Sequence, residues 1–286
     1  MSRRAYTLRA RDKKLELGRR THLMGVVNVT PDSFFDGGRF MEPAQAIERC
    51  LELAENGADI LDLGGESSRP GAEPIPCEEE LERILPVLEQ VRKVVSLPIS
   101  IDTYKSQVAE EAFREGADIV NDISAFRFDP ELPGIIRKWG AGVVLMHMRG
   151  TPETMQDNAF SEDILGEVQT DLQAAVATAV ESGISRQQIV IDPGIGFGKT
   201  LEDNLKILNR LRDLDSLDLP IVVGTSRKSF LGKILNLPAQ DRLWGSAASV
   251  TASIMRGAHI VRVHDVEEMK QVAQITDAVL VEGPLP

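Results

Sequence analysis

The chain repeats one pattern of hydrophobic and polar positions eight times: a short apolar run ends in a polar or glycine-rich cluster, and a stretch with helical spacing follows. Short apolar runs that alternate with amphipathic segments predict parallel β-strands joined by helices. Eight such units predict a closed (β/α)8 TIM barrel of the α/β class. The predicted strands are residues 22–28, 59–65, 98–103, 118–123, 142–148, 189–194, 220–226 and 259–265.

The segments that lead into several of these runs share a second repeat. The sequence NGADI occupies 56–60 and EGADI occupies 115–119, and looser copies begin at Trp139 and Arg256. In each copy a glycine can adopt the left-handed conformation that ends a helix, and a β-branched residue opens the next strand. The recurrence indicates one αβ unit copied around a ring. The clearest helical spacing, over 164–180, predicts an outer helix that packs on the barrel.

Residues 1–20 stand apart from the repeat. Their alternation around Asp12 and Lys13, with Gly18 nearby, predicts a small β-hairpin that caps the N-terminal mouth of the barrel. Residues 21–286 are expected to form one barrel domain, because no linker interrupts them and the length of 286 residues is close to the ~250 usual for this fold.

Charge and composition exclude several classes of protein. Asp and Glu number 44 against 32 Lys and Arg, and the net charge of −12 disfavours binding to nucleic acid. No apolar run approaches the ~20 residues that span a bilayer, and the charged N-terminus lacks the apolar core of a secretion signal. We therefore expect a cytoplasmic protein that does not bind a membrane. Cys50 and Cys77 have no CxxC spacing, so neither a disulfide nor a zinc site is predicted.

Each predicted strand ends at, or is soon followed by, a polar side chain. Because the carboxyl ends of barrel strands meet at one rim, where such proteins hold catalytic groups, these side chains predict an active site. A single Asp or Asn there could simply cap the next helix, but convergence of the whole set favours function. Two long loops, 29–42 and 65–76, are expected to act as lids or binding loops. The polar positions are Asn28, Glu66, Asp102, Asn121, His147, Asp192, Lys228 and His264.

Eight motifs along residues 22–266 closely resemble those of dihydropteroate synthases, and they occur in the order of that family. They are NVTPDSFFDGGR at 28–39, DLGGESSRPGA at 62–72, IDTYK at 101–105, VNDI at 120–123, LMHM at 145–148, DPGIGFGK at 192–199, SRKS at 226–229 and RVHDV at 262–266. One position departs from the family pattern: Ser68 stands where threonine is common.

The resemblance implies a transferase of folate biosynthesis, the pathway step that sulfonamides target. Such an enzyme condenses 6-hydroxymethyl-7,8-dihydropterin pyrophosphate with p-aminobenzoate and releases 7,8-dihydropteroate and pyrophosphate. Pyrophosphate would depart first, and the arylamine would capture the pterin cation. The resemblance also implies Mg²⁺ as cofactor and a homodimer formed through outer helices.

The family's site residues can be placed on this chain. Asp102, Asp192 and Lys228 would be catalytic, because a buried carboxylate can accept paired hydrogen bonds from a pterin and an anion near the methylene favours a cation. The pterin site would add Asn121, Met146 and Phe197. The pyrophosphate site would hold Asn28, Ser68, Arg262 and His264, with Asn28 also giving an oxygen to Mg²⁺. The p-aminobenzoate site would hold Phe34, Ser68, Arg69, Pro70 and Ser229, the last at a helix N-terminus.

Three alternatives compete with this interpretation. A pterin-binding barrel that transfers a methyl group from methyltetrahydrofolate to a corrinoid could share Asp102, Asn121 and Asp192, but it would not need the two long loops. A non-catalytic pterin binder would be expected to lack Asp102, Lys228 or Arg262, and all three are present. An aldolase could use Lys228 to form a Schiff base, since phosphate-sugar barrels share rim lysines.

Overall fold

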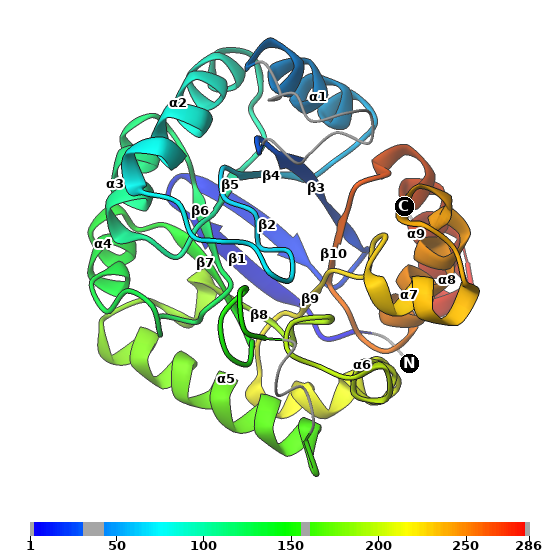
Figure 1. Ribbon diagram of the computed structural model, residues 1–286. Helices are drawn as coiled ribbons and strands as arrows, with labels where there is room; N and C mark the ends of the chain where they lie inside the picture. The colour runs from blue at the N-terminus through cyan, green and yellow to red at the C-terminus, as the bar shows by residue number, and fades with distance from the viewer. Residues whose placement is uncertain (1–2, 31–42, 156–160, 284–286) are drawn as a thin grey trace.

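Eight parallel strands form a ring that helices surround (Figure 1). The structure is a computed structural model that describes residues 3–30, 43–155 and 161–283. The strands of the ring are β3 (His22–Asn28), β4 (Ile60–Gly64), β5 (Ile99–Asp102), β6 (Ile119–Asp122), β7 (Gly142–Met146), β8 (Ile189–Asp192), β9 (Val222–Val223) and β10 (Ile260–Val263).

The strands are hydrogen-bonded in the order β8-β7-β6-β5-β4-β3-β10-β9, which is sequential around the ring. A parallel bridge between Ile191 and Ile221 joins the two ends of this order and closes the barrel. The predicted (β/α)8 TIM barrel is therefore confirmed. Gly57 and Gly116, the glycines of the two closest repeats, have φ values of 97° and 99°, which is the left-handed conformation that ends a helix before a strand.

Helices fill the connections between successive strands and cover the outside of the ring. Of the described helices, none is long and apolar enough to cross a membrane. The predicted outer helix over 164–180 is α5, whose buried stripe includes Val168, Leu172 and Val176. The α-helices are α1 (Pro43–Glu55), α2 (Cys77–Val94), α3 (Ser106–Arg114), α4 (Leu132–Trp139), α5 (Ile164–Glu181), α6 (Leu201–Asn209), α7 (Ser229–Leu235), α8 (Leu243–Met255) and α9 (Val266–Val281). Short 3₁₀ helices occupy Arg186–Gln188, Leu211–Leu217 and Ala239–Asp241.

A β-hairpin precedes the barrel, as the sequence predicts. Its strands β1 (Tyr6–Ala10) and β2 (Lys13–Leu17) pair antiparallel, and in Figure 1 they cross the middle of the ring. Apolar side chains of the hairpin pack in one buried cluster with residues near the start of the barrel strands. The cluster contains Leu8, Ala10, Leu17, Met24, Ile60, Ile119, Val144, Val190, Val222 and Ile260. The hairpin therefore fills the N-terminal mouth, and the polar strand ends lie at the opposite rim.

Candidate active site

Two carboxylates and a guanidinium from three strands meet at the carboxyl rim of the barrel. Arg262 of β10 donates from Nη2 to Asp102 Oδ2 at 2.7 Å, and from Nε to Asp62 Oδ2 at 2.6 Å. Asn121 of β6 donates from Nδ2 to the same oxygen of Asp62 at 3.3 Å. Residues up to 200 positions apart in the chain are thus joined in one buried network.

Asp62 is a member of this network that the sequence interpretation missed. Its side chain is fully buried in β4, and none of the described residues forms a hydrogen bond with its Oδ1. The sequence does carry a signal, because an acidic residue inside an apolar strand run must find a partner when the strand is buried. The interpretation considered only the ends of the runs, and Asp62 lies in the middle of one.

Burial raises the pKa of Asp102 to about 7. The positive charge of Arg262 opposes this shift, while the negative charge of Asp62 adds to it. Two carboxylates share one guanidinium, so full ionisation of both leaves an excess negative charge in a region of low dielectric. The pKa of Asp102 is therefore well above that of an ordinary aspartate.

Lys228 and Asp192 are two further charged groups at the same rim, and their opposite charges interact. Lys228 donates from Nζ to the carbonyl oxygen of Ile195, and its Nζ lies 4.7 Å from the centroid of the Phe197 ring. Burial lowers the pKa of Lys228 to about 8, and the charge of Asp192 opposes that shift. Burial also raises the pKa of Asp192, whose Oδ1 accepts a 2.7 Å hydrogen bond from the backbone N–H of Gly194.

An apolar wall lies beside these charged groups. Met146, at the end of β7, belongs to a buried cluster with Ile123, Met148 and Met155, against which Phe197 packs. Apolar faces next to a carboxylate and an ammonium suit a flat ring that carries hydrogen-bonding edges. The structure thus brings Met146 and Phe197 to one side of the rim, where the sequence interpretation expects a planar heterocycle.

Asn28 and His264 lie at the rim near Asp102 and Arg262. A methyl group placed on Gly64 would lie 3.7 Å from Asn28 Oδ1 and 3.4 Å from Asp102 Cβ, so both side chains border the same position. His264 Nδ1 is 3.0 Å from Ser226 Oγ. Burial, with the charge of Arg262, lowers the pKa of His264 to about 4. His264 is thus neutral at pH 7 and can donate a hydrogen bond to an anion.

The second long loop is anchored at its base by a half-buried lysine. Lys105 donates from Nζ to Glu66 Oε2 at 2.7 Å, to Glu80 Oε2 at 2.6 Å and to the carbonyl oxygen of Ile75 at 2.7 Å. Glu66, one of the predicted rim residues, therefore holds the loop through Lys105. The tip of the loop contacts the connection after β7, where the N–H of Gly71 donates to Pro152 O at 2.9 Å.

The predicted p-aminobenzoate residues occupy several places around the rim. Ser68 lines a small cavity together with Asp102 and Tyr104, which brings the second loop next to the charged network. Arg69 and Pro70 follow it on the exposed part of the loop. Ser229 is the first residue of α7, directly after Lys228. Phe34 lies outside the described residues.

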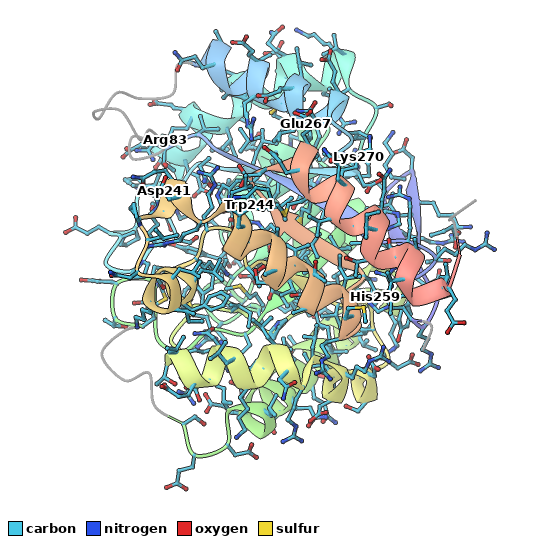
Figure 2. All side chains as sticks on the ribbon, turned by 90° about the vertical axis from the view of Figure 1, so that its right-hand side faces the viewer. Arg83, Asp241, Trp244, His259, Glu267 and Lys270 are labelled. Carbon is cyan, nitrogen blue, oxygen red and sulfur yellow. The ribbon has the colours of Figure 1, made fainter. Side chains whose placement is uncertain are left out.

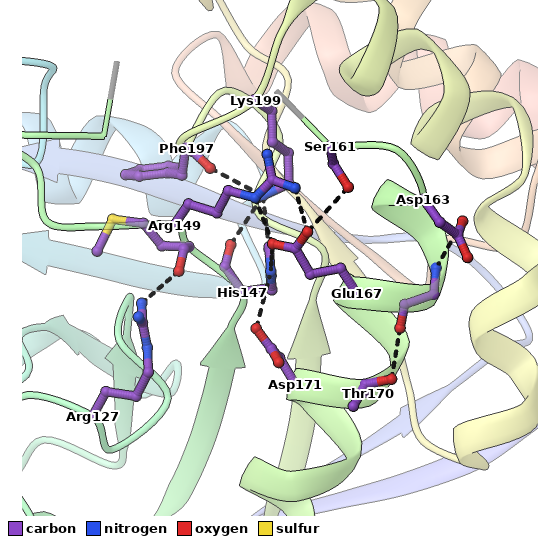
Figure 3. A network of polar contacts seen from close by, with 12 residues as sticks. Arg127, His147, Arg149, Ser161, Asp163, Glu167, Thr170, Asp171, Phe197 and Lys199 are labelled. Atoms are coloured by element: carbon purple, nitrogen blue, oxygen red, sulfur yellow. Dashed lines mark hydrogen bonds and ion pairs between the residues drawn. The ribbon is translucent and has the colours of Figure 1, made fainter. Parts of the chain in front are cut away.

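A polar network behind the rim contains three possible metal ligands (Figure 3). Single ligand atoms of His147, Glu167 and Asp171 lie within 4.8 Å of one another. Arg149 forms an ion pair with Glu167, and Lys199 Nζ lies 2.9 Å from His147 Nδ1. Burial and these nearby cations lower the pKa of His147 to about 2. The same charges oppose a metal cation at this position, so we do not assign one there.

The fold and the rim together define a TIM-barrel protein whose site suits a flat heterocycle and an anion. The model of the pterin-binding enzyme family matches residues 24–264. The chain is 46% identical over 262 residues to dihydropteroate synthase of Synechocystis sp., covering 91% of each protein. It is 43% identical to dihydropteroate synthase of Bacillus subtilis, covering 92% of this chain and 90% of that protein.

Solved structures agree with these relatives. A Yersinia pestis dihydropteroate synthase in complex with a sulfonamide drug matches with a TM-score of 0.91 and 38% identity, covering 96% of this chain and 99% of that one. A Xanthomonas albilineans dihydropteroate synthase with 4-aminobenzoic acid matches with a TM-score of 0.89 and 38% identity, covering 97% and 99%. The chain therefore belongs to the pterin-binding enzyme family, among its dihydropteroate synthases, which are transferases of folate synthesis.

Proposed function

We propose that the carboxyl rim condenses 6-hydroxymethyl-7,8-dihydropterin pyrophosphate with p-aminobenzoate to give 7,8-dihydropteroate and pyrophosphate. The observation that carries this proposal is the meeting, beside one apolar wall, of the Arg262–Asp102 ion pair with the opposite charges of Lys228 and Asp192. One pair suits an ester that must lose an anion, and the other suits a heterocycle with donors and acceptors on its edge.

In this proposal the pterin edge binds to Asp192, Asn121 and Lys228. The Asp192 carboxylate accepts hydrogen bonds from the 2-amino group and a ring N–H, because both are donors. Asn121 donates one Nδ2 hydrogen to Asp62, and its Oδ1 can accept a hydrogen bond from a ring donor. The Lys228 ammonium donates to a ring acceptor. Met146 and Phe197 cover the apolar faces of the ring.

The leaving group lies with Arg262, Ser68 and His264. Arg262 supplies a fixed positive charge, while neutral His264 and Ser68 supply hydrogen bonds. Ionised Asp102 favours the positive charge that develops on the methylene as its C–O bond breaks. Asn28 fits a hard cation because it presents an amide oxygen beside the same position, and Mg²⁺ bound there would lower the basicity of the departing pyrophosphate.

The arylamine attacks the cation and needs little activation, because the electrophile is already charged. Its lone pair forms the new C–N bond, and the amine proton is then released. Ser68, Arg69, Pro70 and Ser229 are proposed to hold p-aminobenzoate, together with Phe34. Closure of the second loop over this position would exclude water, which otherwise captures the same cation.

A pyrophosphate-release assay tests the proposed function. We expect release to require both the dihydropterin pyrophosphate and p-aminobenzoate, with 7,8-dihydropteroate formed in equal amount, and to fall when Mg²⁺ is removed. Release at an undiminished rate without p-aminobenzoate would instead indicate hydrolysis. Methyl transfer from methyltetrahydrofolate to a corrinoid, or borohydride trapping of a carbonyl substrate on Lys228, would favour the alternative barrels.

The pH dependence of kcat/KM is predicted to be a narrow bell. Asp102 must be ionised to stabilise the cation, and its pKa is about 7, so activity rises with pH through that value. Lys228 must keep its proton to bind the pterin edge, and its pKa is about 8, so activity falls above that value. The pH profile of kcat/KM reports groups of the free enzyme, whereas that of kcat reports groups of the complex. Measuring both profiles therefore separates the limbs of Asp102 and Lys228 from groups that titrate in the complex. The residual activity of Asp102→Asn should lack the acidic limb, and an unchanged limb would contradict the assignment.

We further propose a homodimer that forms through α8 and α9. These two helices present an open apolar groove of about 520 Å³ whose lining includes Met255, Val272, Ile275 and Val279. Figure 2 faces this side of the molecule, with Trp244 at the start of α8. The side chains of Trp244 and Ile275 are 81% and 70% exposed in the single chain. Large apolar side chains gathered on one face are typical of a subunit interface.

The variant Ile275→Asp is expected to shift the protein from dimer to monomer in sedimentation experiments, because a charge in the centre of an apolar interface loses its water. Val94→Asp is the matched control, since Val94 is similarly exposed, at 68%, but lies on α2. A wild-type protein that sediments as a monomer, or an unchanged dimer in Ile275→Asp, would exclude this interface.

A further inference from the structure

Lys199 is a buried lysine to which the proposed reaction gives no part. Only 4% of its surface is exposed, and it lies at the end of the turn that joins β8 to α6. Placing an ammonium group in the interior is unfavourable unless hydrogen-bond acceptors replace the water that it loses. The surroundings of Lys199 therefore indicate what it holds.

The ammonium group of Lys199 faces three acceptors. Its Nζ lies 2.9 Å from His147 Nδ1, 3.2 Å from His147 O and 3.1 Å from Phe197 O (Figure 3). An ammonium has three N–H donors, so each can be used once. Burial lowers the pKa of Lys199 to about 7, and a neutral amine would still donate to both carbonyl oxygens. The two contacts that join the backbones of His147 and Phe197 can therefore persist in either protonation state.

These acceptors belong to two segments that carry the pterin site. His147 follows Met146 of β7, while Phe197 belongs to the turn after Asp192 of β8. The two backbones are in close contact, since a methyl group on Gly194 would lie 1.9 Å from His147 O. Gly194 has a φ of 67°, so the turn depends on a residue without a side chain at this point.

Lys228 binds the same turn from the side of the rim. It donates to Ile195 O and lies over the ring of Phe197. Lys199 binds the Phe197 carbonyl and attaches it to the end of β7. The position of the Phe197 ring, and of the acceptor that orients Lys228, thus depends on contacts behind the site as well as within it.

We propose that Lys199 is a positioning residue that clamps the turn 192–199 to the end of β7 and so sets the pterin site. It touches no substrate. Lys199 acts through Phe197 and, by way of Ile195, through Lys228. This inference rests on the proposed function, since it assigns Lys199 to the pterin half of that site.

The test compares Lys199→Met with the wild type. Methionine keeps most of the side-chain length but removes the three donors. We expect the KM for the dihydropterin pyrophosphate and the Kd for 6-hydroxymethylpterin, measured by calorimetry, to rise by about 10- to 100-fold. The KM for p-aminobenzoate should change by less than about 3-fold. Lys206→Met is the matched control, because Lys206 lies exposed on α6 and should leave every constant unchanged.

A second pair of variants keeps the test decisive if Lys199→Met does not fold. His147→Asn can place an amide oxygen near the position of Nδ1 and should retain most of the pterin affinity, whereas His147→Leu removes that acceptor and should lose affinity. Unchanged pterin affinity in Lys199→Met, or equal losses for both substrates, would overturn the clamp. If Lys199→Met does not fold, equal affinities in the two His147 variants would overturn it. A wild-type protein that does not bind pterin would instead overturn the proposed function.

Discussion

Replacing Asp192 by asparagine is expected to abolish most pterin binding without unfolding the protein. The substitution puts an N–H donor where the proposed pterin edge also presents donors, and it removes a charge-assisted hydrogen bond. The cost is about 3 kcal/mol, or ~100-fold in Kd. Burial raises the pKa of Asp192, which means that the folded protein disfavours its charged form. Replacing the carboxylate by a neutral amide should therefore not destabilise the fold. Calorimetry with 6-hydroxymethylpterin measures the binding, and thermal unfolding measures the stability.

Asp241→Asn is the control for this experiment, since Asp241 is an exposed carboxylate in the 3₁₀ turn between α7 and α8 and is not assigned to the site. It should bind pterin as tightly as the wild type. The assignment of Asp192 to the pterin edge is wrong if Asp192→Asn keeps the affinity of the wild type. A large fall in the unfolding temperature would show instead that Asp192 stabilises the fold.

Replacing Arg262 by alanine should produce the second large effect, on both binding and stability. Asp62 and Asp102 would lose the cation that they share, and a buried charge without its partner destabilises a protein by ~3–5 kcal/mol. The Kd for the pterin pyrophosphate ester should also rise far more than the Kd for unesterified pterin, because Arg262 is proposed to bind the leaving group. Thermal unfolding and calorimetry with both ligands measure these two effects.

Two further variants separate the roles of Arg262. Arg262→Lys keeps a positive charge, so the variant should fold. Lysine cannot contact both carboxylates with one planar group, so the variant should discriminate less well than the wild type between the ester and free pterin. Asp62→Asn combined with Arg262→Ala should regain part of the lost stability, since one unpaired charge is removed. Equal losses for ester and free pterin in Arg262→Lys would contradict a role in pyrophosphate binding.

The barrel and most of its rim could be predicted from the sequence because they depend on local patterns. Each of the eight predicted strands contains an observed strand of the ring. The largest difference is β9, which has only two residues, Val222–Val223, within the predicted 220–226. Pro220 has no N–H for a ladder hydrogen bond. The backbone at Gly224 lies close to Arg262, since a methyl group there would be 3.6 Å from Arg262 Cβ.

The pairing of charges across the rim could not be predicted, because it depends on distances between remote strands. Arg262 was expected in the pyrophosphate site, and the structure adds that it binds Asp62 and Asp102. His264 was expected in the same pyrophosphate site, and burial there keeps it neutral. Lys199 stands seven residues past the end of β8, so a search of strand ends does not find it.

The hairpin at the opposite end of the barrel has a consequence for how reactants enter the site and how products leave it. The buried apolar cluster that it forms with the barrel strands occupies the N-terminal end of the ring, so the site is reached from the carboxyl rim. Both reactants are expected to enter, and both products to leave, from the carboxyl rim. We therefore expect release of pyrophosphate and entry of the next substrates to compete for the same side of the barrel.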